Sequence, residues 1–183
     1  MLRRANVGIF IEAPRVDEES IKSSMISEGA DPRDIADTLA EAKARKVAGK
    51  HAAELVLGCD QVLAMKDRVF TKPESIRHAK DQLRELRGQT HHLFSAAVIY
   101  EDNEPVWRHI GQVRLTMRDV SDAYIDDYVD RNWESIRWSV GSYKLEEEGV
   151  RLFSRIDGNY FDVLGMPLLE LLSYLTLRGT LPG

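Results

Sequence analysis

The stretch Leu55-Val56-Leu57-Gly58-Cys59-Asp60 decides the fold class of this chain. Its three consecutive apolar residues are bounded by a glycine, which is typical of a strand that is buried on both faces. Asp60 follows this strand, and the ligands of open α/β sheets bind at the carboxyl ends of strands. A carboxylate at that place is either a turn residue or a group that holds a metal ion or a water molecule, and the pattern alone leaves both interpretations open.

Helices are predicted on both sides of this strand. The pair Asp31-Pro32 marks a strong helix start, because an acidic N-cap precedes a proline at the first helical position, and this helix ends at Gly49. A second helix is predicted to open at Lys72-Pro73 and to run to Arg87, where a glycine follows. Further helices are predicted at about 18–28, 121–131 and from 167 onward. Further strands are predicted at 7–12, 91–100, 106–117 and 150–156, with a hairpin at 62–69 that turns at Lys66-Asp67.

Length and charge narrow the class of protein further. The 183 residues suit one domain, and the interleaved helices and strands predict an α/β fold with a mixed sheet, since hairpins require antiparallel neighbours. With 30 acidic and 25 basic residues the net charge is −5, so we expect neither a nucleic-acid partner nor a membrane surface. Met1–Asn6 has no apolar segment of a signal peptide, and Glu170 interrupts the apolar stretch at 168–177. We therefore expect a cytoplasmic protein.

One lysine interrupts an apolar helix face. The helix that starts at Asp31 places four residues at successive i+4 positions, namely Ile35, Leu39, Lys43 and Val47. Either the Lys43 side chain extends past its neighbours to water, or its ammonium lies at the wall of a cleft and binds an anion. The spacing does not decide between the two.

Three other features have an ordinary and a functional interpretation. Lys72 precedes a predicted helix start, where free N–H groups favour anions, although a solvated surface lysine gives the same pattern. The only cysteine, Cys59, excludes an internal disulfide, and beside Asp60 it is expected to be a small buried residue rather than a nucleophile, because a carboxylate raises the pKa of a neighbouring thiol. The acidic run at 146–148 is, by itself, typical of a solvated face.

Eight short motifs occur in order over nearly the whole chain. They are Val16-Asp17-Glu18, Leu39-Ala40-Glu41-Ala42-Lys43-Ala44, Gly58-Cys59-Asp60-Gln61-Val62, Lys72-Pro73, Leu86-Arg87-Gly88-Gln89-Thr90-His91, Ser95-Ala96-Ala97-Val98, Gly141-Ser142-Tyr143-Lys144-Leu145-Glu146 and Leu164-Gly165-Met166-Pro167-Leu168. With these motifs the chain resembles the Maf-like nucleoside triphosphate pyrophosphatase family. The resemblance implies a single domain over residues 1–183 with a three-layer α/β/α architecture and two lobes around a deep cleft.

The resemblance also implies an activity. It is the hydrolysis of a nucleoside triphosphate to the monophosphate and pyrophosphate with a divalent cation, Mg²⁺ or Mn²⁺, which removes modified nucleotides from the cell. It implies that Asp60 is the proton acceptor or a metal ligand, that Asp17 or Glu18 is a second, metal-binding carboxylate, and that Lys43 and Lys72 bind phosphate. Attack of water on the α-phosphorus needs such acids and cations. A homodimer is implied as well.

Two residues bear on the choice of base. By resemblance, Gln61 and Glu146 occupy specificity positions and are closer to the branch that acts on N7-methyl-GTP than to the branch that prefers dTTP and UTP. Guanine offers N1–H and N2–H donors to a carboxylate, and N7 methylation adds a positive charge. A uracil or thymine edge presents two carbonyls that Glu146 would repel.

The chain departs from the family at its beginning. The family opens with a strand and a Ser-x-Ser-x-x-Arg loop, whereas this chain begins with Met1-Leu2-Arg3-Arg4, which resembles the helix after that loop. We therefore expect an N-terminally incomplete domain with a start codon further upstream, and weak turnover of the chain as it stands. Two alternatives to an active enzyme stay open: a nucleotide-binding regulator of septum formation without turnover, and a truncated pseudoenzyme.

Overall fold

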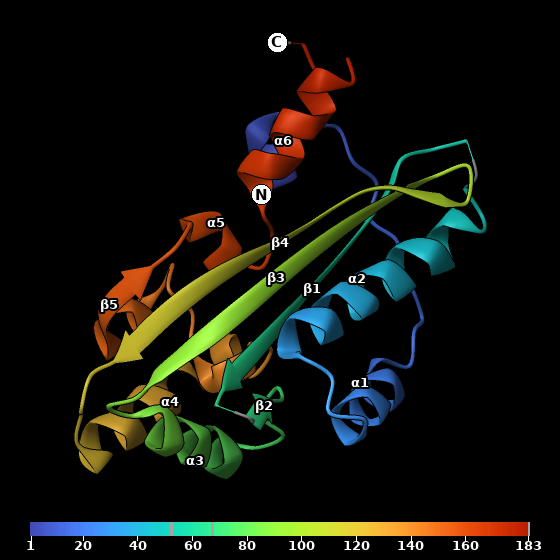
Figure 1. Ribbon diagram of the computed structural model, residues 1–183. Helices are drawn as coiled ribbons and strands as arrows, with labels where there is room; N and C mark the ends of the chain where they lie inside the picture. Colours follow the sequence, from blue (N-terminus) through green and yellow to red (C-terminus); the bar gives the residue numbers. More distant parts are fainter. Residues whose placement is uncertain (52, 67, 183) are drawn as a thin grey trace. The chain divides into compact units, whose positions relative to one another are not determined.

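The computed structural model describes residues 1–51, 53–66 and 68–182, and it confirms the α/β class (Figure 1). The strands form one open sheet in the order β2-β1-β3-β4-β5. Their bounds are β1 Val56–Met65, β2 Arg68–Phe70, β3 Thr90–Glu101, β4 Glu104–Met117 and β5 Phe153–Asp157. The α-helices are α1 Glu18–Ser27, α2 Pro32–Ala48, α3 Ile76–Leu86, α4 Asp122–Ile136, α5 Tyr160–Val163 and α6 Leu168–Leu177. Short 3-10 helices cover Leu2–Ala5, Val140–Ser142 and Glu148–Leu152.

The sheet is antiparallel, which corrects the expected mixed sheet. β3 and β4 are joined by Asp102 and Asn103, whose φ angles of 49° and 64° suit the tight hairpin turns that match strand twist. β1 pairs antiparallel with β2, with Leu63 opposite Phe70, and β4 pairs in the same sense with β5. Between β2 and β3, α3 returns the chain to the end of the sheet at which β1 stops, so β3 runs back against β1 (Figure 1).

β1 is longer than predicted. The predicted strand at 55–57 and the first arm of the predicted hairpin are one continuous strand, and Asp60 lies inside it rather than after it. A strand is held by its backbone hydrogen bonds to a neighbouring strand, so one acidic side chain does not end it when that side chain has its own partner. Asp67, at the predicted turn, lies outside the described residues.

Two other predicted strands differ from the structure. Residues 7–12, all within the described part of the chain, have no regular secondary structure, and Phe10 and Ile11 are exposed. Strand-like sequence is not enough there, because a strand needs a neighbour for its backbone hydrogen bonds. At 150–156 the chain first forms the 3-10 helix Glu148–Leu152, and β5 begins only at Phe153.

The chain divides into two compact units. Unit 1 contains residues 1–61, 95–111 and those from Gly165 onward, and unit 2 contains Val62–Phe94 and Gln112–Leu164. Strands β1, β3 and β4 each contribute residues to both units.

Unit 1 has three layers. On β3, Tyr100 donates a hydrogen bond to Glu41 of α2 (3.0 Å), whereas its neighbour Glu101 accepts one from Arg178 at the end of α6 (2.8 Å). Adjacent residues of a strand point to opposite faces, so α2 covers one face of this part of the sheet and α6 the other. The predicted α/β/α layering therefore holds within unit 1.

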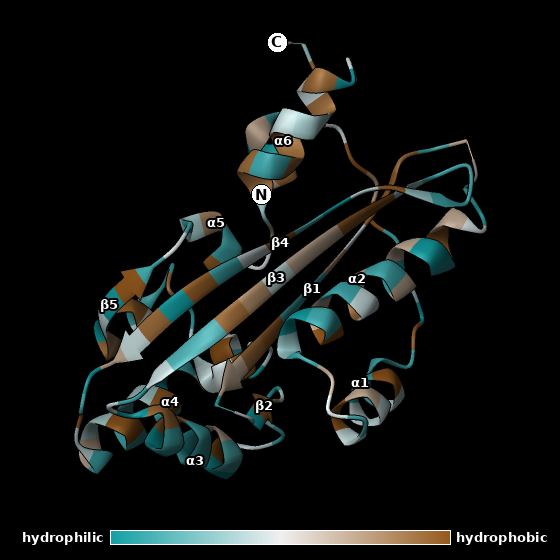
Figure 2. Ribbon diagram, viewed as in Figure 1, coloured by the Kyte–Doolittle hydropathy of each residue, from teal (hydrophilic) through white to brown (hydrophobic). Residues whose placement is uncertain are grey.

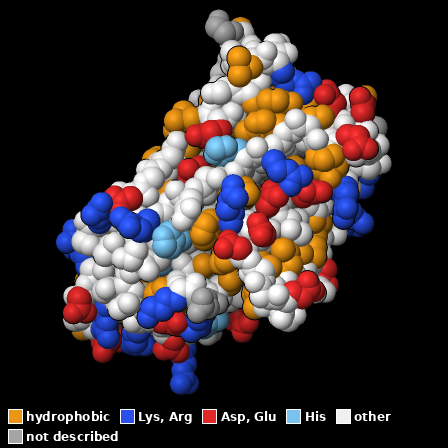
Figure 3. Space-filling model, viewed as in Figure 1, with side chains coloured by type: hydrophobic (Ala, Val, Ile, Leu, Met, Phe, Trp, Pro, Cys, Tyr) orange, Lys and Arg blue, Asp and Glu red, His pale blue; other side chains and the backbone are white. Residues whose placement is uncertain are grey.

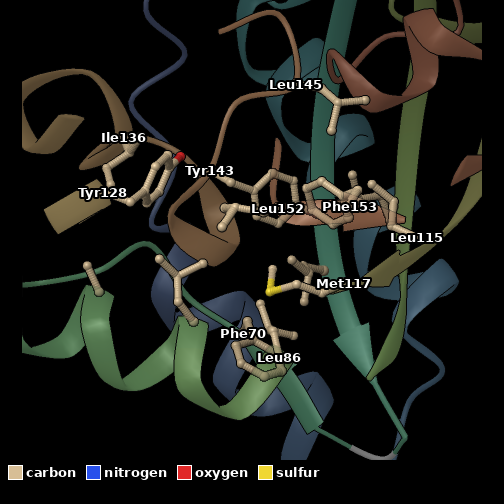
Figure 4. Close-up of a cluster of buried hydrophobic side chains, with 14 of the residues drawn as sticks. Phe70, Leu86, Leu115, Met117, Tyr128, Ile136, Tyr143, Leu145, Leu152 and Phe153 are labelled. Atoms are coloured by element: carbon tan, nitrogen blue, oxygen red, sulfur yellow. The ribbon is translucent and has the colours of Figure 1, made fainter. Parts of the chain in front are cut away.

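Unit 2 is built on one hydrophobic cluster. Figure 4 shows side chains from α3, α4 and the strands meeting there. The labelled members are Phe70, Leu86, Leu115, Met117, Tyr128, Ile136, Tyr143, Leu145, Leu152 and Phe153. The helices contribute one apolar stripe each and remain hydrophilic on the other side, as the teal surface of α3 in Figure 2 shows.

Positively and negatively charged side chains are interspersed on the surface. Acidic and basic side chains lie next to one another on the face that Figure 3 shows. Charged side chains of the protein form local ion pairs, such as Arg84 with Asp126 at 2.7 Å and Lys80 with Asp130 at 2.8 Å. In the part of the chain that the structure describes, no helix is both long and apolar enough to cross a membrane.

Candidate active site

A glycine allows α2 to lie directly against β1 in unit 1. A Cβ atom at Gly58 would stand 2.2 Å from the carbonyl oxygen of Ala40 and 2.6 Å from the backbone nitrogen of Ala44, both on α2. Those distances leave no room for any side chain. Asp60 is two residues further along β1 and therefore shares the face of Gly58, so the close approach brings it next to the helix residue Lys43.

Lys43 is the centre of a cluster of charges. Its Nζ atom lies 2.6 Å from Oδ1 of Asp60 and 3.0 Å from Oε2 of Glu18. The side chains of Lys43 and Asp60 are only 17% and 11% exposed, whereas Glu18 is 44% exposed. Lys43 thus does not extend past its neighbours to water, and the interpretation of a solvated lysine is wrong. Its ammonium is held inside the fold by two carboxylates.

Glu18 and Asp17 have different tasks. Glu18, in the first turn of α1, reaches Lys43. Asp17 is the N-cap of the same helix, and its Oδ1 accepts a hydrogen bond from the backbone nitrogen of Ser20 at 3.0 Å. Of the two candidate second carboxylates, the structure therefore brings Glu18 to Asp60 and uses Asp17 to start the helix.

Burial and charge act against each other in this cluster. Burial raises the pKa of Asp60 above its usual range, and the attraction of Lys43 opposes this without cancelling it. For Lys43, burial acts to lower the pKa, but the charge and the hydrogen bonds of Asp60 and Glu18 outweigh it and raise the pKa. Asp60 is thus a better proton acceptor than an ordinary aspartate, because its raised pKa lies closer to neutral pH.

Two further side chains, Cys59 and Lys22, interact with the charges of the cluster. Burial of the Cys59 thiol raises its pKa to about 12, so it stays protonated and is not a nucleophile, as expected. Lys22 is a further charged neighbour, whose attraction opposes the rise in the pKa of Asp60 that burial causes. The sequence signal for it is its i+4 spacing from Glu18, which places both on one face of α1.

Gln61 lies on the opposite face of β1 from Asp60. Its Nε2 donates a hydrogen bond to Oγ of the buried Ser95 at 2.9 Å. Gly165 lies beside the same side chain, at the start of the segment that leads into α6. Asp60 and Gln61 are adjacent in the sequence, and their side chains therefore lie on opposite faces of the sheet in unit 1.

Lys72 and Glu146 belong to unit 2, and both are exposed. The helix predicted to open at Lys72-Pro73 begins later, at Ile76, because the side chain of Ser75 accepts from the backbone nitrogen of His78 and caps it there. The prediction that Lys72 lies at a helix start is therefore wrong. Lys72 precedes the helix by a short connecting segment.

The acidic run at 146–148 is not a uniformly solvated face. Glu147 accepts a hydrogen bond from Ser135 at 2.6 Å, and Glu148 accepts one from Asn132 at 2.8 Å. Both of these acids are thereby tied to α4, whereas Glu146 points outward as an exposed residue. Glu147 and Glu148 therefore have structural contacts with α4, whereas Glu146 is exposed to solvent.

The charge cluster contains two carboxylates, the kind of ligand that Mg²⁺ takes from a protein. Two carboxylates, those of Glu18 and Asp60, lie within 3.0 Å of the same ammonium and so converge on one place. Mg²⁺ usually takes one or two protein carboxylates and completes its shell with water and substrate phosphate. Among the described residues no group of three or more acidic, His or Cys side chains forms a closed metal cage. The two carboxylates thus have the oxygen chemistry that Mg²⁺ prefers, and in this structure the oxygens that converge hold the Lys43 ammonium.

Comparisons with known proteins agree with one another. The family described as Maf-like protein matches residues 1–177. A nucleoside triphosphate pyrophosphatase of Ruegeria sp. (strain TM1040) is 61% identical over 179 residues, which are 98% of this chain and 90% of that protein. The protein of the same name from Roseobacter denitrificans is 62% identical over 182 residues, 100% of this chain and 92% of that protein. A 7-methyl-GTP pyrophosphatase of Rhizobium etli is 42% identical over 180 residues, 97% of this chain and 90% of that protein.

Proposed function

Because the chain belongs to the Maf family, we propose that it is a hydrolase that cleaves nucleoside triphosphates to the monophosphate and pyrophosphate. Relatives more than 60% identical to it carry the name nucleoside triphosphate pyrophosphatase. The observation that carries the proposal is the cluster of Lys43, Asp60 and Glu18, in which Lys43 and Asp60 are largely buried. It combines an acid of raised pKa with a cation, which are the two groups that water attack on a phosphorus requires.

The residues of the cluster have distinct roles in this reaction. Asp60 accepts the proton of the attacking water, and its raised pKa supports that role. Lys43 stays protonated and provides a positive charge for a phosphate oxygen. A divalent cation, when bound by Asp60 and Glu18, would supply further charge neutralisation on the phosphates. Holding the acid and the ammonium 2.6 Å apart orients both before substrate arrives.

Three further residues are proposed to bind the other parts of the nucleotide, namely Lys72 and Glu146 of unit 2 and Gln61 of unit 1. Lys72 is exposed and is proposed, from the family resemblance, as a second phosphate-binding cation. Gln61 and Glu146 are proposed to select the base, with N7-methyl-GTP preferred over UTP. The 42% identical relative named 7-methyl-GTP pyrophosphatase supports this preference, as does the attraction between the Glu146 carboxylate and a cationic methylated guanine.

The test is pyrophosphate release from a panel of nucleoside triphosphates, with and without Mg²⁺. We expect release that depends on Mg²⁺ and that falls by about 10²–10⁴-fold in Asp60→Asn, because an amide cannot accept the proton. Glu19→Gln is the matched control, since Glu19 is an exposed acid beside Glu18 and should keep wild-type activity. Nucleotide binding without any release would contradict the proposal and favour a regulator without turnover.

A further inference from the structure

We infer that Gln82, a buried glutamine of α3, is a positioning residue that fixes both the segment of Lys72 and the loop of Glu146. The inference rests on the proposed function, because those two residues are proposed to bind phosphate and base. Gln82 is only 2% exposed. Its Nε2 donates a hydrogen bond to the carbonyl oxygen of Thr71 at 2.8 Å, and its Oε1 accepts one from Oγ of Ser142 at 3.0 Å.

A glutamine is an unusual choice for this position. Gln82 lies on the buried face of α3 with Ala79, Leu83 and Leu86, where packing alone would be satisfied by an apolar residue. Burying an amide is unfavourable unless both of its ends are hydrogen-bonded. Here both ends are bonded: Nε2 also contacts Nε2 of His78 one turn earlier on α3 (3.2 Å), and the two partners outside the helix belong to different segments of unit 2. The side chain therefore acts as a clamp between those segments.

The first segment held by the clamp carries Lys72. Thr71, whose carbonyl accepts the bond, is the residue immediately before it, and Pro73 immediately after it is buried. The backbone is thus fixed on both sides of Lys72 while the lysine side chain stays exposed. A fixed backbone restricts the positions that the Lys72 ammonium can reach. The exposed side chain is thereby oriented for binding.

The second segment is the loop from Gly141 to Glu146. Gly141 and Ser142 have φ angles of 75° and 60°, and a serine in this left-handed region is strained. The bond from Ser142 to Gln82 helps to hold this conformation. The next residue, Tyr143, is hydrogen-bonded through its hydroxyl to Nε2 of the buried His91 at 2.9 Å, and it is one of the labelled core residues in Figure 4. The loop that presents Glu146 is therefore anchored at two successive residues.

The two arms of the clamp predict two separable defects. Ser142→Ala removes the loop arm and keeps the bond to Thr71, so it should affect base selection alone. Gln82→Met removes both arms at nearly the same volume, so it should affect base selection and phosphate binding together. Gln112→Met is the matched control, because Gln112 is an exposed glutamine of unit 2.

The experiment measures inhibition by inorganic pyrophosphate and the ratio of kcat/KM for N7-methyl-GTP over UTP. For Gln82→Met we expect the pyrophosphate inhibition constant to rise and the nucleotide ratio to fall, each by about threefold to tenfold, as expected for the loss of a buried hydrogen bond. For Ser142→Ala only the nucleotide ratio should fall. A folded Gln82→Met with both values as in the wild type would overturn the inference. If Gln82→Met does not fold, the inference is tested with Ser142→Ala. An unchanged ratio of kcat/KM for N7-methyl-GTP over UTP in that variant would also overturn it.

Hydrogen exchange separates this inference from the proposed function. In Gln82→Met the backbone amides of residues 71–74 and 139–146 should exchange faster than in the wild type, while those of α2 should not change. Unchanged exchange in both segments contradicts the clamp, whether or not the chain is an enzyme. A wild-type chain that releases no pyrophosphate contradicts only the proposed function.

Discussion

Each unit of the molecule contains a network of polar side chains, and the two networks differ in charge. Unit 1 buries charges, with Lys43 held between the carboxylates of Asp60 and Glu18. In unit 2 the network around Gln82 is neutral, with Gln82 bonded to Ser142 and to a backbone carbonyl. A buried charge shifts pKa values and so prepares a group to move protons, whereas a buried neutral network fixes geometry without titrating. The charged cluster of unit 1 thus suits the proposed proton transfer, and the neutral network of unit 2 suits the proposed positioning.

The largest expected effect comes from removing the cation of unit 1. Lys43→Met leaves Asp60 without its partner at 2.6 Å, and we expect turnover to fall by about a hundredfold or more as charge stabilisation is lost. The pKa of Asp60 should rise further, so the folded state binds a proton that the unfolded state does not. Stability of this variant should therefore fall as pH rises above the usual titration range of an aspartate.

Chemical unfolding at several pH values and pyrophosphate release measure these two effects. Lys46→Met is the control, because Lys46 is an exposed lysine on the same helix. Equal stability of Lys43→Met and the wild type at pH 8, with full activity, would show that the ion pair has no role.

The next effect concerns how the charges are brought together. Gly58→Ala places a methyl group 2.2 Å from the carbonyl oxygen of Ala40, so α2 must move away from β1. We expect a loss of about 3 kcal/mol in the free energy of unfolding, as for other overpacked sites, together with lower activity because Lys43 moves with the helix. Urea unfolding gives the first value and pyrophosphate release the second.

The control for this change is Gly49→Ala at the end of the same helix. Its Cβ would meet the nearest backbone oxygen at 3.8 Å, an ordinary contact, so stability should be unchanged or slightly higher. If both alanine variants behave alike, the close approach at Gly58 is not what positions Lys43.

A smaller effect is expected on the pH dependence of the reaction. The negative charge of Glu18 contributes to raising the pKa of Asp60, although burial is the larger cause. Activity should rise with pH as Asp60 loses its proton, and in Glu18→Gln this acidic limb of kcat/KM should move to lower pH by less than about one unit. A limb that moves to higher pH, or a shift of the same size in Glu19→Gln, would contradict this assignment.

The smallest effect belongs to the neutral network of unit 2. Tyr143→Phe removes the bond to His91, and we expect a loss of about 1 kcal/mol in the free energy of unfolding. Burial lowers the pKa of His91 to about 4, so the network stays neutral above pH 5 and this loss should be the same at pH 6 and pH 8. Tyr160→Phe, at an exposed tyrosine, is the control. A loss that depends on pH in this range would show that His91 carries charge in the fold.

Local chemistry made several features predictable from the sequence. The helix predicted from Asp31-Pro32 to Gly49 is confirmed as α2, since capping depends only on neighbouring residues. Lys43 was recognisable because it interrupts an apolar stripe at i+4 spacing. The start of α3 was mistaken because Pro73 and Ser75 are both good helix starters, and the capping bond of Ser75 decided between them.

The sequence by itself determined the α/β class, the faces of the helices and the residue types available for phosphate chemistry, because periodicity and capping act over a few residues. Only the tertiary structure decided that Asp60 lies inside β1, that Glu18 rather than Asp17 reaches Lys43, and that Gln82 joins two distant segments. It also decided that residues 7–12 form no strand. These outcomes depend on which segments pack together, and a buried charge or amide is stable only where packing supplies its partner.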